Sequence, residues 1–431
     1  MSVRAPKILA VASAIDLDFL YGCTPAWWQL WKGMHEAGCD LIVTPYRGRP
    51  VEAPWWRTEP NPCYREGELF VRARDAVARG RGDTHLRRAE EHPPDTTPEK
   101  LVRQAIWHWV TPRWQRHLDR IFEQERDIDA VIVFGVPMSH FRGIPERLRE
   151  RFSVPVVFYD GDVPMSLPEY GGMDTGFNNY HGAEPGEYDL VVCNSEGGLE
   201  RLRELGARRA EAVFWAADPA LFQPLQVDKQ MDVFFYGYGD KFRRDWMAAM
   251  VGEPSRRLPQ VDFALGGSDF RGDTGRAREI GSVPFNVFGR AISEARVNLN
   301  ITRRAHASVY ASSTSRPFEL AMAGAAFVSN PYEGIERWFE PGRELLLVSS
   351  ADEAADAYRE LLDDTARAEE LGRAARERAL DEHTYLHRAR QLLELIGSLG
   401  PGDGGSRTAN DALGERSTGG ATLPGLARPR R

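Results

Sequence analysis

The segment from Asn298 to Gly342 constrains the fold of this 431-residue chain more than any other part of it. The apolar residues 297–301 predict a strand, and the serine- and threonine-rich loop 308–315 leads into a short helix. Pro317 suits the first turn of that helix, where a missing N–H costs nothing, and Gly324 suits its end. Residues 326–329 then predict a second buried strand. Strand, helix and strand in this order favour a parallel α/β sheet.

The start of this helix has the composition of an anion site. Backbone N–H groups and the helix dipole face a ligand there, and Ser313, Ser315 and Arg316 add further donors. Glu319 follows within the first turn or so, where a carboxylate can accept hydrogen bonds from sugar hydroxyls. Together these residues predict a ligand in which a phosphate is joined to a ribose.

This arrangement resembles the donor-binding half of GT-B glycosyltransferases, and most closely their CgeB-like group. The resembling residues are Asn298, Asn300, Ser313, Arg316, Phe318, Glu319, Gly324, Pro331, Gly334, Phe339, Pro341 and Gly342. The likeness continues through Glu382–Ile396, which resembles the closing helix of the family. The resemblance implies two Rossmann-like, doubly wound α/β domains that face each other across a cleft. It also implies a nucleoside-diphosphate sugar as donor substrate, an unidentified acceptor and no cofactor besides the donor.

The sequence departs from the family pattern at one position. Related retaining enzymes carry a glutamate, seven further residues and a second glutamate. Glu319 fits the second position, whereas Ala311 occupies the first. A catalytic role tied to the first glutamate is therefore not transferred to this chain. The resemblance favours retention of anomeric configuration, and the departure leaves inversion open.

Alternating strand and helix patterns predict two domains. Apolar runs at 7–12, 40–43, 130–134, 154–159 and 189–193 predict parallel strands with helices on both faces, and a second alternation runs from Met231 to Val348. The expected organisation is an acceptor domain at 1–222 with an insertion at about 44–98, a nucleotide-sugar domain at 223–381, a closing helix at 382–399 and a disordered tail at 400–431.

A second donor element is expected where the second domain begins. Gly237 and Gly239 follow a strand and allow the backbone to approach a diphosphate, while Arg243 or Arg244 can neutralise it. A lone Gly-x-Gly favours an ordinary tight turn. Its position in the same domain as Arg316 favours the donor role, and the arginines make a metal unnecessary.

Acidic and histidine side chains at strand ends are candidates for the acceptor side. Asp160 and Asp162 follow a buried strand and can hold a hydroxyl or act as a base. His140 follows another strand, with His181 as an alternative. The Asp-x-Asp pattern also occurs at 16–18 and 127–129, so it is unspecific, and we predict no metal site. Asp16 is a further acceptor-side candidate.

The insertion is rich in proline and arginine, shows no clear strand and is expected to line the acceptor side with Trp55 and Trp56. Core packing explains the helical spacing of Trp27 and Trp31, whereas Trp28 either stacks on a sugar or is buried against the insertion. Pro112 should kink or divide the helix predicted over 98–126. His383 and His387 lie one turn apart, and capping or packing explains them better than a metal.

Composition excludes several classes. A net charge of −8 gives no basis for a nucleic-acid surface, and no apolar run approaches the ~18 residues of a membrane span. Four cysteines without metal-ligand spacing fit reduced thiols and a cytoplasmic protein. Three alternatives remain: a non-catalytic sugar or nucleotide-sugar binding protein, a nucleotide-sugar epimerase, and a phosphorylase. A phosphorylase would need a lysine in the second domain to bind its cofactor, and only Lys241 is available near that site.

Overall fold

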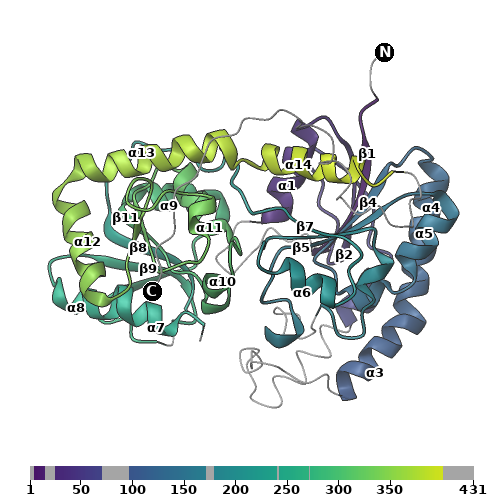
Figure 1. The fold of residues 1–431 in the computed structure, drawn as a ribbon, viewed down its shortest axis with the longest axis horizontal. Helices are drawn as coiled ribbons and strands as arrows, with labels where there is room; N and C mark the ends of the chain where they lie inside the picture. Colours follow the sequence, from purple (N-terminus) through teal and green to yellow (C-terminus); the bar gives the residue numbers. More distant parts are fainter. Residues whose placement is uncertain are drawn as a thin grey trace, which may run out of the picture.

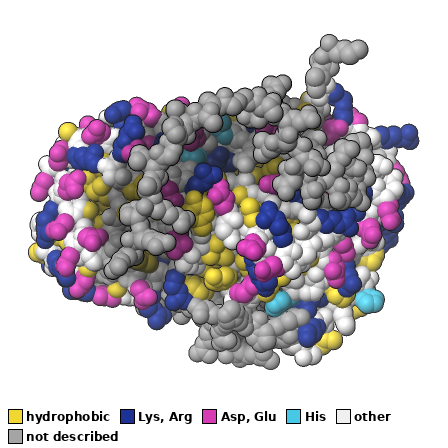
Figure 2. Space-filling model, in the orientation of Figure 1, with side chains coloured by type: hydrophobic (Ala, Val, Ile, Leu, Met, Phe, Trp, Pro, Cys, Tyr) yellow, Lys and Arg dark blue, Asp and Glu magenta, His cyan; other side chains and the backbone are white. Residues whose placement is uncertain are grey.

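The computed structural model describes residues 4–14, 25–69, 97–170, 179–239, 242–270 and 272–400. These residues form two α/β domains, bridged by helices that run along the top of both in Figure 1. The predicted Asp16 and Lys241, residues 70–96 of the insertion and the tail beyond Gly400 lie outside the described residues. On the face in Figure 2, acidic and basic side chains are mixed over both domains.

The first domain is built on a seven-stranded parallel sheet with the order β3-β2-β1-β4-β5-β6-β7. The strands are β1 (Lys7–Ala14), β2 (Asp40–Arg47), β3 (Arg57–Thr58), β4 (Ala130–Phe134), β5 (Val156–Asp160), β6 (Leu190–Cys193) and β7 (Ala210–Ala212). β4, β5 and β6 are buried along their whole length, because helices cover both faces of the sheet. One face carries α1 (Ala26–Glu36), and the other carries α4 (Thr111–Gln124) and α5 (Ile144–Phe152).

The second domain repeats this topology in a six-stranded parallel sheet with the order β10-β9-β8-β11-β12-β13. The strands are β8 (Met231–Tyr238), β9 (Phe263–Ser268), β10 (Arg278–Gly281), β11 (Ala295–Asn300), β12 (Phe327–Ser329) and β13 (Leu346–Leu347). One face carries α9 (Phe285–Glu294), α11 (Ser315–Met322) and α13 (Thr365–Glu382), and the other carries α7 (Arg244–Met247) and α12 (Ala351–Asp363). The prediction of two doubly wound parallel domains is confirmed.

The last helix, α14 (Tyr385–Gly397), returns to the first domain and packs against α1 (Figure 1). A Cβ atom on Gly33 of α1 would lie 2.6 Å from the Tyr385 carbonyl oxygen, so glycine is required at this contact. Arg388 of α14 donates to the carbonyl oxygens of Phe214 and Trp215, and burial lowers its pKa to about 10. The second domain is thus followed by a helix that packs on the first.

The predicted roles of His383 and His387 as packing and capping residues are confirmed. Nε2 of His383 lies 3.0 Å from the carbonyl oxygen of Trp338, and its ring packs against Phe318. His387 forms a capping box with Thr384 at the start of α14.

The long helix before β4 is divided, as predicted from Pro112. α3 (Thr97–Ala105) leads into a π-helical turn (Ile106–Val110), and α4 carries Pro112 in its first turn. Because proline has no N–H, the helix hydrogen-bond pattern is interrupted there.

The described part of the insertion packs onto α1. Trp28 and Trp55 meet edge to face with centroids 4.7 Å apart, and Trp27 and Trp56 do so at 6.2 Å. Trp27 and Trp31 are core residues, and Trp28 is packed against the insertion. The prediction that the insertion holds no strand is wrong at β3, which pairs with β2 over only two residues.

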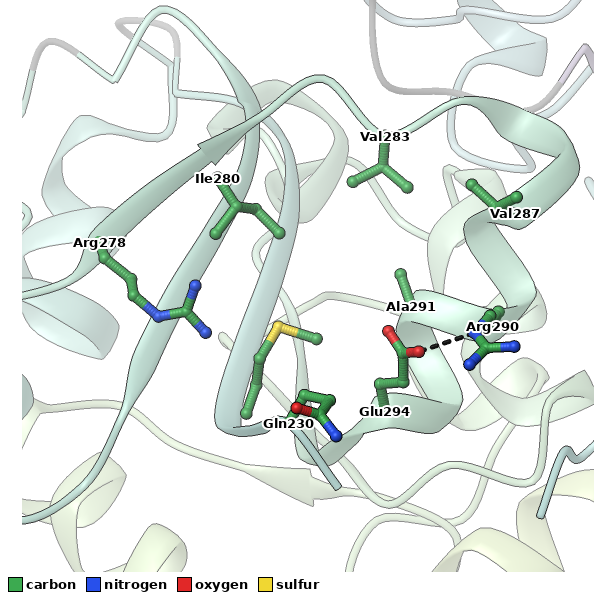
Figure 3. Close-up of a pocket in the computed structure, with 9 residues that line it drawn as sticks. Gln230, Arg278, Ile280, Val283, Val287, Arg290, Ala291 and Glu294 are labelled. Carbon is green, nitrogen blue, oxygen red and sulfur yellow. Dashed lines mark hydrogen bonds and ion pairs between the residues drawn. The ribbon is translucent and has the colours of Figure 1, made fainter. Parts of the chain in front are cut away.

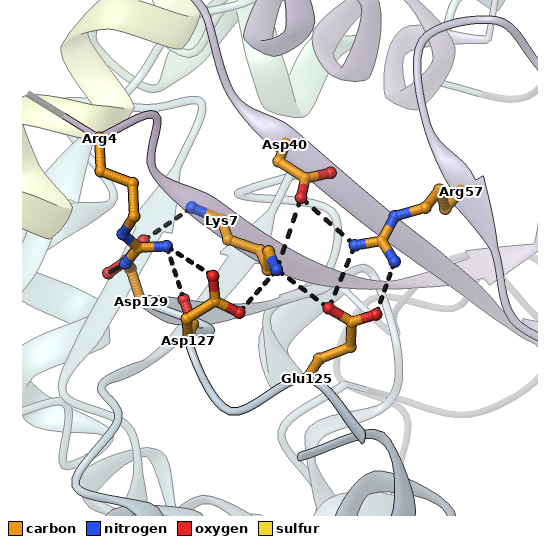
Figure 4. Close-up of polar contacts among 7 residues, drawn as sticks. All are labelled: Arg4, Lys7, Asp40, Arg57, Glu125, Asp127 and Asp129. Atoms are coloured by element: carbon orange, nitrogen blue, oxygen red, sulfur yellow. Dashed lines mark hydrogen bonds and ion pairs between the residues drawn. The ribbon is translucent and has the colours of Figure 1, made fainter. Parts of the chain in front are cut away.

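A network of ion pairs lies at the amino-terminal ends of the strands in the first sheet (Figure 4). Nζ of Lys7 lies 2.9 Å from a Glu125 carboxylate oxygen and 2.6 Å from Asp127, and Arg4 pairs with Asp129 at 2.6 Å. One of the three Asp-x-Asp patterns, at 127–129, is therefore part of a structural network, at the edge of the sheet opposite the carboxyl ends where ligands bind.

Candidate active site

A pocket of about 680 Å³ lies between the two domains. Loops that follow β5 and β6 form its first wall, and residues that follow β8 and β11 form its second wall. The lining residues are Pro164, Leu167, Glu169, Tyr170, Gly197, Gly198, Arg201, Phe242, Arg304, Ala305, Ser308 and Val309. The pocket is therefore at the carboxyl ends of both sheets, where open α/β sheets bind ligands.

The loop before α11 docks directly on the first domain. Oγ of Ser313 donates to the Asn194 carbonyl oxygen at 3.0 Å and accepts from the Trp215 N–H at 2.9 Å. The hydroxyls of Ser195 and Ser312 lie 2.5 Å apart. The buried Ser313 hydroxyl, predicted to bind the donor, is thus engaged in an interdomain contact, whereas Ser315 begins α11 and is partly exposed.

The structure brings together two other predicted donor residues, Arg316 and Glu319. Nε of Arg316 lies 3.3 Å from Oε2 of Glu319, and the same guanidinium donates to the Tyr236 carbonyl oxygen. Its carbon lies 5.2 Å from the Tyr236 ring centroid and 4.8 Å from that of Phe288. The side chain of Arg316 is 13% exposed and that of Glu319 is fully buried, so the buried carboxylate holds the partly exposed guanidinium in place.

The two glycines and two arginines predicted to bind the diphosphate, at the end of β8 and after it, have different surroundings. A Cβ atom on Gly239 would lie 2.5 Å from the Phe270 ring, so close packing accounts for this glycine, and Gly237 has a φ of 152°. Arg243 donates to the Ile301 and Tyr238 carbonyl oxygens and thereby joins the ends of β11 and β8. Arg244 is exposed at the start of α7 and is the better placed of the two arginines to meet a ligand.

Asp160 and Asp162 have different environments. Asp160 is buried at the end of β5, where it accepts from the Tyr180 hydroxyl at 2.6 Å and from the Asp162 N–H at 3.1 Å. Burial raises the pKa of the Asp160 carboxyl, and its hydrogen bonds oppose that shift. A Cβ atom on Gly161 would lie 2.4 Å from the Trp215 ring, which explains the glycine between the two aspartates.

Asp162 faces the second domain. Its Oδ1 lies 3.4 Å from Nε2 of His306 and 3.9 Å from a guanidinium nitrogen of Arg303, and its side chain is 19% exposed. Sequence reasoning missed His306. The signal available was its position after the carboxyl end of β11, within the segment that carries the family resemblance.

The structure places His140 away from the pocket. Its ring is buried beside Tyr46, which in turn packs against Trp114 and Phe141, and the Tyr46 hydroxyl lies 2.8 Å from Nδ1. Burial lowers the pKa of His140 to about 3. These surroundings fit a neutral packing residue and do not support an acceptor base. His181 is partly buried and does not line the pocket.

A second pocket, of about 370 Å³, lies between β10 and α9 of the second domain (Figure 3). Ile280 of β10 and Val283 point into it, and Arg290 pairs with Glu294 at 2.8 Å on its rim. It includes Met231, the first residue of β8, so it lies at the amino-terminal edge of the sheet and contains no predicted site residue.

Within the residues that the structure describes, no group of three or more His, Cys, Asp or Glu side chains is arranged to hold a metal ion. Within the same residues, no helix has the length and apolarity required to cross a bilayer.

Comparisons with known proteins agree with this geometry. Residues 243–394 match the family described as glycosyl transferase-like, and no curated protein matches the chain. Sucrose-phosphate synthase from Thermosynechococcus elongatus is similar over 91% of this chain and 99% of its own, with a TM-score of 0.62 and 15% identity. HepE from Anabaena, in complex with UDP and glucose, is similar over 91% and 100%, with a TM-score of 0.56 and 12% identity. The trehalose-6-phosphate protein of E. coli, bound with UDP-2-fluoro glucose, is similar over 90% and 98%, with a TM-score of 0.59 and 13% identity.

The two doubly wound domains are therefore the GT-B fold. Within that fold, residues 243–394, which include α11, match the family described as glycosyl transferase-like.

Proposed function

We propose that the protein transfers a sugar from a nucleoside-diphosphate sugar to a hydroxyl of an acceptor bound between the domains, and that it stands nearest to the CgeB-like group. The observation that carries this proposal is the Arg316–Glu319 pair on α11, within the family-matched segment and at the carboxyl edge of the second sheet. Two of the similar structures contain UDP or a UDP-sugar, which makes UDP-glucose the first donor to test.

On the donor side, the main electrostatic task is to stabilise the departing diphosphate, because negative charge accumulates there in the transition state. Arg316, with the N-terminal end of α11, and the exposed Arg244 would supply this stabilisation without a metal. Glu319 holds the Arg316 guanidinium and would orient the ribose of a bound donor.

On the acceptor side, Asp162 would accept a hydrogen bond from the acceptor hydroxyl at the pocket wall. The hydroxyl oxygen forms the new bond to the anomeric carbon, and the bond from that carbon to the diphosphate breaks with its electron pair on the diphosphate. If Asp162 takes the proton as a base, attack from the opposite face inverts the configuration. If Asp162 only holds the hydroxyl, the departing phosphate takes the proton and configuration is retained. The anomeric configuration of the product separates these two roles.

A non-catalytic nucleotide-sugar binding protein is the second candidate, favoured by Ala311 at the position of the missing glutamate. Ala311 is fully buried with a φ of 46°, and a Cβ atom on Gly334 would lie 2.3 Å from its backbone nitrogen.

One experiment separates the two candidates. The purified protein is incubated with UDP-glucose and other nucleoside-diphosphate sugars, and release of the nucleoside diphosphate is followed with and without acceptors. Slow release of the nucleoside diphosphate would support the enzyme if Asp162→Asn reduces it and the control Glu279→Gln, at an exposed residue, does not. Binding without any turnover would identify a binding protein.

A further inference from the structure

His306 makes a contact between the two domains. It belongs to the short helix α10 (Arg304–Ser308) of the second domain and is 2% exposed. Its Nε2 lies 3.4 Å from Oδ1 of Asp162, in the loop that follows β5 of the first domain. An imidazole from one domain therefore faces a carboxylate from the other.

Each partner also keeps one buried polar atom without a hydrogen bond. Among the described residues, Nδ1 of His306 and Oδ2 of Asp162 have no partner. Buried polar atoms in folded proteins are nearly always hydrogen-bonded, so both atoms keep the capacity to bind a further polar group. Pro164, Arg304 and Ala305, close in the chain to this pair, line the interdomain pocket. The pair is thus next in the chain to residues of the pocket wall, although neither Asp162 nor His306 lines the pocket itself.

We propose that His306 is a positioning residue that aims Asp162 at the acceptor hydroxyl; this inference rests on the proposed function. Nε2–H of His306 donates to Oδ1, which fixes the carboxylate plane and leaves Oδ2 to accept the substrate hydroxyl. The 3.4 Å separation exceeds an ordinary N–H···O distance of about 2.7–3.2 Å. Hydrogen bonds of this kind are often long before substrate binds and shorten in the complex.

The pair bridges the two domains, because Asp162 belongs to the first and His306 to the second. Arg303 of the second domain lies 3.9 Å from the same Asp162 oxygen and adds positive charge, whereas the imidazole adds direction. Residues of the second domain thus surround the acceptor-side carboxylate of the first.

The test uses the full chain with UDP-glucose, or the best donor found, and compares four variants. His306→Ala removes the donor N–H, His306→Gln keeps one, Asp162→Asn removes the carboxylate, and the fourth combines His306→Ala with Asp162→Asn. His117→Gln is the matched control, because His117 is also buried but packs against Thr44 in the first domain. The measurements are kcat and KM for both substrates, the Kd for UDP, and a thermal melt of each variant.

His306→Ala is expected to lower kcat by about 10²-fold, the scale of loss that a small misalignment of a reacting group causes, with the Kd for UDP within about threefold of wild type. His306→Gln should recover most of that loss, and the double variant should be no slower than Asp162→Asn. The proposal is overturned if His306→Ala keeps the wild-type kcat, or if His306→Gln and His306→Ala lower kcat equally. It is also overturned if the affinity for UDP falls in parallel with kcat, or if the fall in kcat of the double variant is the product of the two single falls. If wild type neither binds UDP nor turns over any nucleoside-diphosphate sugar, the proposed function fails, and this inference fails with it.

Discussion

Three buried histidines should make the folded chain sensitive to mild acid. In each, Nδ1 faces a hydrogen-bond donor: Arg120 at 2.8 Å for His117, the Tyr46 hydroxyl at 2.8 Å for His140, and Arg388 at 2.7 Å for His383. A proton on Nδ1 would oppose the two arginines, which can only donate, whereas the Tyr46 hydroxyl can also accept. Burial, with an arginine nearby, lowers the pKa of His117 to about 4 and those of His140 and His383 to about 3.

The size of the effect follows from linkage. An unfolded histidine titrates near 6.5, so the unfolded chain takes up protons first as the pH falls. The stability from a neutral buried histidine is therefore present above about pH 6.5 and is lost as the pH falls towards the folded pKa. Lowering the pH from 7 to 5 therefore reduces the free energy of unfolding by about 2 kcal/mol for each histidine, or by roughly 6 kcal/mol for all three. That sum approaches the total stability of many proteins, about 5–15 kcal/mol.

The assay is urea unfolding of the full chain at pH 7, 6 and 5. His383→Gln should flatten the pH dependence by about a third, because glutamine keeps a donor and an acceptor but does not titrate. His35→Gln, at an exposed histidine, is the control and should leave the slope unchanged. A free energy of unfolding that stays constant from pH 7 to pH 5, or a slope that His383→Gln does not change, would refute the reasoning.

Three further predictions concern the site. Ser313→Ala should lower the free energy of unfolding by about 1–3 kcal/mol, because the Trp215 N–H loses its acceptor, and should leave UDP affinity nearly unchanged; the opposite pattern would return Ser313 to the donor site. Gly161→Ala should slow transfer more than it weakens UDP binding, because the new methyl group meets the Trp215 ring and displaces the neighbouring Asp162; equal effects on both would contradict this account. Transfer should survive EDTA, whereas a complete loss restored by Mn²⁺ or Mg²⁺ would point to Asp160 and Asp162 as metal ligands.

Much of the fold could be predicted because its strands carry the information locally. The run at 130–134 is buried on both faces and was located to the residue. Two of the strands that escaped prediction, β10 and β3, are peripheral or short. β10 is exposed along its length at the sheet edge, and β3 has only two residues, so neither carries an apolar run.

The site was predicted less completely, because much of it depends on contacts between distant parts of the chain. A serine at a helix start looks the same in sequence whether its hydroxyl faces a phosphate or, as for Ser313, a carbonyl group 119 residues away. The contact between His306 and Asp162 has the same origin, since each residue alone is ordinary. The Arg316–Glu319 pair could be located, because its two members lie three residues apart on one helix.

The most direct test of the central claim is calorimetric titration of UDP into wild type, Arg316→Lys and the control Arg290→Lys. Lysine keeps a positive charge beside Glu319 but loses the planar fork that suits a diphosphate. Arg290 pairs with Glu294 at the pocket between β10 and α9. The account predicts that UDP or another nucleoside diphosphate binds wild type and the control alike, and about 10-fold or more weakly to Arg316→Lys, as expected for one lost charge-assisted hydrogen bond. Absence of nucleoside-diphosphate binding, or equal affinity in all three proteins, would contradict it.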